Sequence, residues 1–470
     1  MKYKIVVFFV ALSCLLPRGE AALPDSAKSP VVKVSQIFII GNKKTQPDII
    51  LREVNIEKDA YYGLDELRDL AEKGRMRIYN TNLFNEVSIQ VLETMETEVD
   101  ILIRVEERWY FYPSPLFRIA DRNLMDWLIN RDGQLNRFNY GLKLDQYNLR
   151  GRNERLRFIG QLGFERRFLL SYSIPYIESS QRHGLSMDLV YNERENMPYI
   201  TRDHVPVFLD VDQINRTSFQ TAVTYSYRPS YYSFHYFTTG FQKGHVSDTI
   251  ALLNPNYYGN GRTDQQFFRL RYSFVNDQRN NRNFPTEGHY AKMTLEQFGL
   301  GAFDDVGIFT AELTLDKYNQ LGHGFYLANS LFGHFSTPAQ QPYYNYTALG
   351  YNDIFARGFE LDVIEGPHYF LSKNSLRFQL LDTKKDMAHK MKIDQFNDFK
   401  LAMYLKLFCD MGWVTNYPNY EVNNRLTDTY LYSIGTGLDF KTMYDLIFRL
   451  EYSYNSEREF NFAINLRADI

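Results

Sequence analysis

The stretch LAMYLKLFCD, Leu401 to Asp410, switches at every position between two kinds of side chain. Apolar residues take the odd positions and a mixed, partly charged set takes the even ones: Leu401, Met403, Leu405, Leu407 and Cys409 against Ala402, Tyr404, Lys406, Phe408 and Asp410. Residues two apart share one face of a β-strand. The stretch therefore predicts a strand with one apolar face and one face that carries charge.

The same alternation recurs over residues 109–470, for example in YDLIFRLEYSY (Tyr444–Tyr454) and from Phe460 to the chain end. Windows of this kind lie near 110–118, 138–147, 154–163, 166–174, 184–191, 217–226, 231–240, 266–274, 289–298, 306–316, 324–332, 371–381, 401–409, 430–438, 444–453 and 459–469. They predict about sixteen strands, an even number like those of single-chain bacterial barrels.

An apolar face opposite a polar face also fits a soluble β-sandwich. Three observations favour a membrane barrel instead. The apolar faces continue over about ten residues, which is the length that a tilted strand needs to cross a bilayer. Tyrosines gather at strand ends, as in an interfacial belt. Charges recur on the other face of nearly every strand, which suits a hydrated lumen and would be costly in a dry core.

Composition agrees with this fold class. The 470 residues include 36 Tyr and 36 Phe, which favour strands, and the net charge of −3 gives no reason to expect nucleic acid as a partner. Beyond the N-terminal segment, the sequence has no apolar run long enough for a transmembrane helix. An exported chain of this kind is either soluble or spans the membrane as a barrel.

The N-terminus predicts export. Lys2 and Lys4 precede an apolar run from Ile5 to Leu16, and small residues follow, so residues 1–21 are expected to be a signal peptide. The run is too short for a membrane anchor. Lipidation at Cys14 stays open, although the residues before it match a lipidation motif poorly. The mature chain would then hold one cysteine and no intrachain disulfide.

Residues 22–33 are expected to be a linker, and residues 34–108 a small α+β domain with the order strand, helix, helix, strand, strand. Thr45 is expected to cap the first helix, and the second runs from Leu64 to Tyr79. The stretches IFIIGNKKTQPDIILREV, RIYNTNLFNEVSI and VDILIRVEER resemble a POTRA domain over its whole length. The resemblance implies that an exposed edge of the domain's sheet accepts an extended client segment. The alternative is that the domain is only a spacer or a docking module.

The loop stretch FARGFE, Phe355 to Glu360, lies between the windows that end near residue 332 and begin near residue 371. An isolated arginine in such a loop is most often solvated. A loop that folds into the lumen would instead bring Arg357 to the polar side of the 401–410 strand, where Asp410 lies. A bidentate ion pair there would be weakly screened, and Gly358 would permit close approach of the backbone.

These two stretches also carry a second resemblance. ARGF and the downstream FCDMG resemble motifs of the outer-membrane assembly superfamily of BamA and TamA, the bacterial surface antigen family, in which POTRA domains precede a sixteen-stranded barrel. The resemblance assigns Arg357, Gly358 and Phe359 to a loop motif inside the lumen, and Phe408, Asp410 and Gly412 to the barrel-wall motif on which it docks. PTEG (285–288), NLRGRNE (148–154) and YSIPY (172–176) agree with it.

The sequence departs from that family in three respects. Ala356 stands where the family often has Val, Ile470 replaces the usual terminal aromatic residue, and a single POTRA domain is expected. Because only one POTRA domain is expected, it stays open whether partner lipoproteins dock on this chain.

The resemblance implies a protein that folds or inserts outer-membrane proteins through a lateral barrel seam, with its POTRA domain in the periplasm. Pro113 and Pro115 remove two backbone donors at or just before the first strand, unless they belong to the linker. The alternative is a pore that secretes a dedicated polypeptide. The expected partners are outer-membrane lipid and unfolded outer-membrane or secreted polypeptides, and periplasmic chaperones or assembly lipoproteins are further candidates. We find no motif of an enzyme, cofactor site or metal site, so none of the three is predicted.

Overall fold

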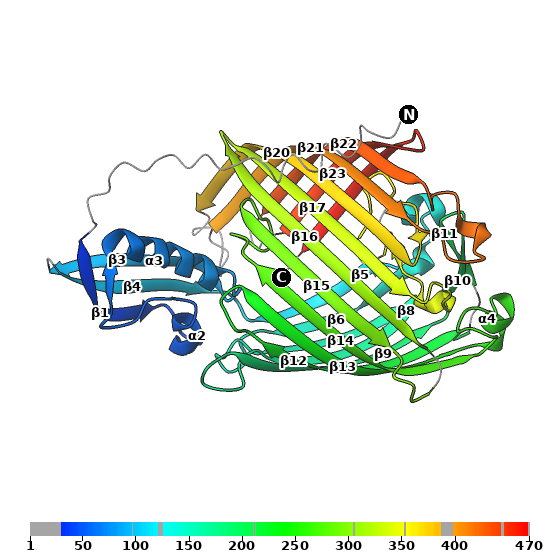
Figure 1. The fold of residues 1–470 in the computed structure, drawn as a ribbon, viewed down its shortest axis with the longest axis horizontal. Helices are drawn as coiled ribbons and strands as arrows, with labels where there is room; N and C mark the ends of the chain where they lie inside the picture. Colours follow the sequence, from blue (N-terminus) through cyan, green and yellow to red (C-terminus); the bar gives the residue numbers. More distant parts are fainter. Residues whose placement is uncertain are drawn as a thin grey trace.

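The computed structural model describes residues 30–95, 97–120, 126–209, 211, 213–303, 306–351, 354–386, 398–442 and 446–468. The predicted signal peptide, Cys14, most of the predicted linker and Ile470 lie outside these residues. Two parts follow one another along the chain: a small α+β unit and a large antiparallel sheet that curves into a barrel (Figure 1).

The barrel sheet has sixteen strands, and each predicted window coincides with one of them. The strands are β5 (Phe111–Ile119), β6 (Phe138–Gln146), β7 (Arg155–Gly163), β8 (Glu165–Ile174), β9 (His183–Arg194), β12 (Arg216–Tyr227), β13 (Ser233–Val246), β14 (Asp264–Asp277), β15 (Gly288–Phe298), β16 (Ile308–Gly322), β17 (Phe325–Thr337), β20 (His368–Asp386), β21 (Asp398–Val414), β22 (Tyr430–Thr442), β23 (Leu446–Asn455) and β24 (Phe460–Ala468). Each strand pairs antiparallel with the next one along this series.

Burial along β21 follows the alternation that the sequence predicts. Lys406, Phe408 and Asp410 are buried on the lumen side, whereas Leu405 and Leu407 are exposed on the outside. Exposed apolar side chains recur on the outer faces of the other strands. This surface suits hydrocarbon, and it identifies the sheet as a transmembrane barrel whose apolar residues face lipid.

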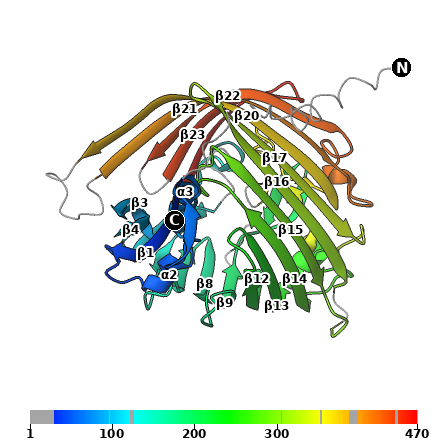
Figure 2. The same cartoon turned by 60° about the vertical axis from the view of Figure 1, so that its left-hand side comes forward.

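The sheet is open at one place. Its order begins at β24 and ends at β5, and within the described residues no backbone pairing joins these two strands. Figure 2 shows the curved sheet from the side on which the small domain lies. Both strands are short, with nine residues each, whereas β20 has 19. Pro113 and Pro115 lie inside β5 rather than in a linker before it. The first and last strands therefore form an unpaired seam.

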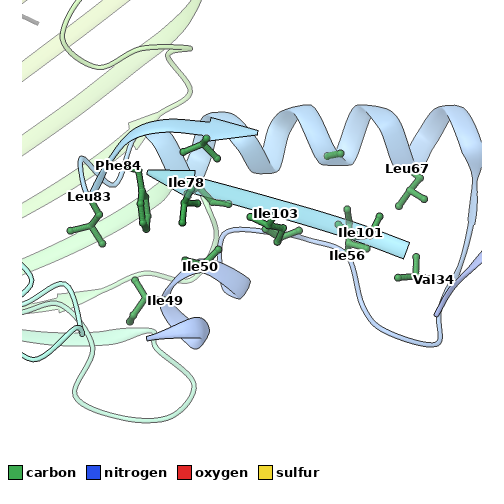
Figure 3. Packing of buried hydrophobic residues seen from close by; sticks show 14 of the residues in the cluster. Val34, Ile49, Ile50, Ile56, Leu67, Ile78, Leu83, Phe84, Ile101 and Ile103 are labelled. Carbon is green, nitrogen blue, oxygen red and sulfur yellow. The ribbon is translucent and has the colours of Figure 1, made fainter. Parts of the chain in front are cut away.

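The N-terminal unit has a four-stranded sheet in the order β2-β1-β4-β3. Its elements are β1 (Val31–Ile40), α2 (Pro47–Leu51), β2 (Tyr61–Gly63), α3 (Leu64–Tyr79), β3 (Phe84–Met95) and β4 (Glu98–Glu107). Leu67 and Ile78 of α3 pack against Ile101 and Ile103 of β4 in a buried apolar cluster (Figure 3). The predicted helices and the three longer strands are present, and β2 is an additional strand of three residues.

The predicted cap at Thr45 is wrong. Gln46 occupies the N-cap position of α2, and no side chain caps this helix. The Thr45 hydroxyl instead donates to Glu107 Oε1 at 2.6 Å and accepts from Asn148 Nδ2 at 2.8 Å. Tertiary contacts thus outweigh local capping, because Thr45 lies where the small domain meets the barrel.

The small domain is fixed to the turns at one end of the barrel. Arg228, in the turn between β12 and β13, makes two hydrogen bonds of 2.6 and 2.8 Å to the buried carboxylate of Glu53. Arg77 of α3 stacks on the ring of Tyr231, with 4.1 Å between the guanidinium and the ring centroid. A buried, bidentate pair of this kind is stronger than a surface salt bridge. The domain is therefore docked at this end and not merely tethered.

Loops close the opposite end of the barrel. The cap comprises β10 (Met197–Arg202), β11 (Val205–Leu209), α4 (Asp248–Leu253), β18 (Ala348–Leu349), β19 (Ile364–Glu365) and the single turns η3 (Tyr343–Asn345) and η5 (Glu421–Asn423). Two more turns, η1 (Asp126–Asn130) and η2 (Leu135–Arg137), lie between β5 and β6. Buried tyrosines, among them Tyr258, Tyr343 and Tyr417, pack together in the cap.

Within the described part of the chain, no helix has the length and apolar character that a membrane-spanning helix needs.

Candidate functional site

The loop between β17 and β20 carries Arg357 against the barrel wall. The Arg357 Nε donates to Asp410 Oδ2 at 2.9 Å, and its Nη2 donates to Asp410 Oδ1 at 2.5 Å. The backbone N–H of Arg357 donates to the same carboxylate at 3.0 Å. The Asp410 side chain is 0% exposed and that of Arg357 is 7% exposed. The pair is bidentate and shielded from water, so its attraction is weakly screened.

Other wall residues complete the surroundings of the guanidinium. Arg357 Nη1 donates to Ser375 Oγ at 2.9 Å, and the guanidinium lies 4.0 Å from the centroid of the Phe408 ring. A Cβ on Gly435 would come within 2.4 Å of that ring, so Gly435 makes room for Phe408. The predicted wall residue Phe408 therefore contacts the loop directly as a cation–π partner.

Gly358 allows the loop tip to touch the last two strands. Its φ is +88°, and a Cβ there would lie 3.1 Å from Ser453 Oγ. Its carbonyl accepts from Asn455 Nδ2 at 2.8 Å and from Asn461 Nδ2 at 3.0 Å. Asn461 belongs to β24, so the loop tip is bonded to a strand of the seam.

Phe359 and Gly412 lie on the cap side of the pair. Phe359 is 2% exposed and packs in an apolar cluster with Leu371 and Val414. A Cβ on Gly412 would stand 3.2 Å from the Phe370 carbonyl oxygen, so little space remains there. The structure thus brings all six predicted residues to one region, three from the loop and three from β21.

A second ion cluster adjoins the first. Lys406 Nζ lies 2.6 Å from Asp439 Oδ1 and 2.7 Å from Glu451 Oε1, and Glu451 Oε1 lies 3.9 Å from Arg357 Nη1. Alternation places Lys406 and Glu451 on the polar faces of their strands but does not show which groups meet. The same alternation places Asn461 on the polar face of the last strand, whereas Asp439, Ser375 and Asn455 gave no sequence signal beyond their residue type.

Replacement of Gly358 by alanine is expected to lower the free energy of unfolding by about 2 kcal/mol, because it adds a Cβ contact to an unfavourable φ. Urea titration of the barrel in detergent micelles measures this change. Gly301→Ala is the control, since Gly301 has φ +77° and nothing within 4 Å of its added Cβ. If both variants lose the same free energy of unfolding, contact of the added Cβ with the barrel wall contributes nothing to the effect of Gly358→Ala.

Glu365 and His204 are buried ionisable groups of the cap. Glu365 is 1% exposed, and it accepts from Thr201 Oγ1 at 2.8 Å and from Asn423 Nδ2 at 3.1 Å. Burial raises the pKa of Glu365 to about 7. His204 is 0% exposed, and burial lowers its pKa to about 4. Both groups are therefore held preferentially in their neutral forms.

The raised pKa of Glu365 predicts a pH dependence. Between pH 4.5, its ordinary value, and about pH 7, the folded protein keeps a proton that the unfolded chain releases, so this contribution to stability is lost as the pH rises. Glu365→Gln has no such proton to release, so its stability is not expected to fall with pH in this range. At pH 8 the variant should be more stable than the wild type by about 3 kcal/mol.

Unfolding by urea at pH 5, 6, 7 and 8 tests this, with the difference between variant and wild type as the readout, because the opposite effect of His204 then cancels. Glu421→Gln, at an exposed carboxylate in the same cap, is the control and should leave the profile unchanged. Parallel profiles for Glu365→Gln and the wild type would contradict the prediction.

Comparison with known protein families shows where this architecture belongs. The Omp85 superfamily domain matches residues 148–467. The chain belongs to the Omp85 superfamily. The POTRA family, described as the surface antigen variable number repeat, matches residues 32–108. No curated protein sequence matches the chain.

Solved structures of Omp85 relatives share the fold. BamA from Haemophilus ducreyi lacking POTRA domains 1–3 is 15% identical, with 93% of this chain and 85% of that chain covered and a TM-score of 0.53. CdiB from Escherichia coli is 9% identical, with 95% and 92% covered and a TM-score of 0.51. Identities this low show the fold alone.

The resemblance to BamA and TamA that the sequence suggested is confirmed at the level of the superfamily. Omp85 proteins are outer-membrane β-barrels whose POTRA domains are normally periplasmic, and they act as transporters or insertases rather than enzymes.

Proposed function

We propose that this Omp85 protein folds and inserts outer-membrane proteins in the bacterial outer membrane. A periplasmic POTRA domain, residues 34–108, would receive unfolded polypeptides, and a barrel, residues 109–470, would insert them at the seam between β5 and β24. The observation that carries the proposal is this unpaired seam. Free strand edges present rows of unpaired N–H and C=O groups, which can template an incoming strand.

The prolines of β5 support a weak seam. Residues two apart direct their backbone nitrogens to the same edge of a strand, so Pro113 and Pro115 remove two donors from one edge of β5. Because β5 is paired with β6 along its length and proline nitrogens favour unpaired edges, we assign this edge to the seam. An edge with fewer donors pairs less well and exchanges partners more readily. The resulting gap in the barrel would also perturb the neighbouring lipid.

The POTRA sheet supplies a docking edge for the client. β3 is an edge strand of twelve residues, and a groove of ≈ 410 Å³ is formed by α3, β3 and β4, with Arg75, Ser88 and Arg104 in its lining. An extended segment can add to such an edge through backbone hydrogen bonds, which are independent of its sequence. This suits a protein that receives many different clients, whether directly or from chaperones.

The lumen loop couples to the seam. The Gly358 carbonyl bonds to Asn461 of β24, while Arg357 fixes the same loop to β21. We therefore assign Arg357, Gly358 and Phe359, with Phe408, Asp410 and Gly412, the role of holding the seam strand in position during insertion.

Secretion of a dedicated polypeptide through the lumen is less well supported. The loop tip occupies the lumen, and a passing chain would have to displace it, which requires breaking the buried pair of Arg357 and Asp410. Insertion at the seam leaves this pair intact.

Reconstitution into liposomes tests the proposed function. A urea-unfolded barrel protein is added to liposomes with and without the full chain, and its folding is followed by protease resistance. We expect folding to be accelerated by at least about tenfold in the presence of the chain. Equal rates in both preparations would contradict an insertase function.

A further inference from the structure

A cavity lies in the barrel lumen between the loop tip at one end and the β14–β15 turn at the other. Its volume is ≈ 770 Å³, within the range of ligand-binding pockets. Arg357 and Phe355 line it from the loop, and Arg282, Phe284 and Pro285 line it from the turn. Eight of its lining side chains are lysine or arginine and three are carboxylates, so basic groups predominate in the lining.

Part of this charge is neutralised by neighbours. Arg357 pairs with Asp410, and Lys406 pairs with Asp439 and Glu451. Arg279 and Arg282 share Asp277, with separations of 2.8 and 3.0 Å. These four cations are held in structural pairs, which leaves four others to account for.

Those four come from three walls of the barrel: Lys292 on β15, Lys373 and Arg377 on β20, and Arg449 on β23. Among the described residues, Lys292 forms no hydrogen bond and no salt bridge, and only a longer-range attraction to Glu312 is present. Lys373 donates to the carbonyl of Phe355 at 3.0 Å and has no salt bridge to a described carboxylate.

The two arginines retain unused donors. Arg377 Nε is buried without a hydrogen-bond partner in the described structure, and its Nη1 makes one long bond of 3.4 Å to the Pro285 carbonyl. Arg449 Nε likewise lacks a hydrogen bond there and lies 3.7 Å from Asp439, which already binds Lys406. Buried donors without acceptors are costly. Of the carboxylates that line the cavity, Glu312 and Asp316 remain beside these four cations, so the cations exceed them by two.

We propose that this cavity binds a phosphate group. Guanidinium groups bind phosphate in a bidentate manner, and a phosphate monoester carries nearly two negative charges on three acceptor oxygens. A single carboxylate has one charge and cannot satisfy cations from three walls. Four cations that line one cavity therefore fit phosphate better than a carboxylate.

Two sources can supply this chemistry. Asn465 of β24 lines the cavity, and β24 borders the seam, so the headgroup of a lipid can approach from the bilayer. A soluble phosphate ester can approach from the end where the POTRA domain lies. The inference does not depend on the insertase function, because it rests on the lumen residues alone.

Isothermal titration calorimetry of the full chain in detergent micelles tests the site, with inorganic pyrophosphate and with short-chain dihexanoyl phosphatidic acid as probes. Lys292→Gln and Arg377→Gln are each expected to weaken pyrophosphate binding by about tenfold or more. Lys292 forms no hydrogen bond or salt bridge to other described residues, so its variant should fold normally.

Lys143→Gln is the matched control. Lys143 pairs with Asp145 on β6, outside the cavity lining, and Asp145 keeps Arg155 at 3.0 Å and Arg157 at 2.7 Å. Its pyrophosphate affinity should equal that of the wild type. If phosphatidic acid binds and pyrophosphate displaces it, the source of the phosphate is a lipid headgroup. If pyrophosphate binds and phosphatidic acid does not, the source is a soluble phosphate.

Three results would overturn the site. They are the absence of saturable pyrophosphate binding to the wild type, equal affinities in the wild type and both cavity variants, and tighter binding of a polyglutamate peptide than of pyrophosphate. The last result would assign the cavity to acidic polypeptide instead.

Discussion

Replacement of Arg357 by glutamine is expected to lower the free energy of unfolding by about 3–5 kcal/mol. The reason is the carboxylate that remains. Asp410 is 0% exposed and accepts three hydrogen bonds from Arg357, two of them from the guanidinium. Without that group a buried charge has no counterion within bonding distance. Urea titration in detergent micelles, followed by tryptophan fluorescence, measures the loss.

Companion variants distinguish loss of the Arg357–Asp410 ion pair from general damage to the fold. Arg357→Lys keeps the charge but loses the planar fork, so an intermediate loss is expected. Arg357→Gln combined with Asp410→Asn removes both charges and should lose less than the sum of the two single variants. The exchange Arg357→Asp with Asp410→Arg should recover part of the folded barrel. A loss below about 1 kcal/mol in Arg357→Gln would show that the pair behaves like an exposed one.

Crosslinking of the seam is expected to stop client insertion. Phe117 on β5 and Phe462 on β24 are both exposed on the outer face, so cysteines are placed there and treated with bismaleimides of increasing spacer length, which join them outside the lumen. Cys409, the free cysteine of the described chain, is first replaced by serine. We expect the locked protein to lose at least about nine tenths of its insertion rate in liposomes, because the strand edges can no longer separate.

A crosslink within a closed part of the sheet is the control. Phe237 and Tyr272 are direct neighbours on β13 and β14, which are already hydrogen-bonded. Cysteines at these positions, joined by the same reagent, should leave the insertion rate unchanged. Undiminished insertion by the protein that is locked between β5 and β24 would exclude the seam as the route.

The sequence predicted the barrel strands well because their signal is local. A period of two residues shows in any ten-residue window, and all sixteen windows coincide with strands. β2 has only three residues, too few for a period to appear, and it was missed. The cap at Thr45 was mispredicted because its partners, Glu107 and Asn148, lie more than 60 residues away.

The lumen site was predicted only in part. Alternation placed Lys406 and Asp410 on the inner face, and family resemblance selected Arg357 as a loop residue. Which strands face one another depends on how the barrel closes, and no local pattern records that. The contacts of Glu451 and Asn461 with the loop region therefore needed the structure, as did the buried position of Glu365 in the cap.

Quantitative proteomics of the outer-membrane and secreted fractions after depletion of this protein tests its function most directly. An insertase predicts a broad fall in other outer-membrane barrel proteins, with secreted proteins affected only as a consequence. Loss of one secreted protein, with the barrel proteins unchanged, would contradict it and would identify a dedicated secretion pore.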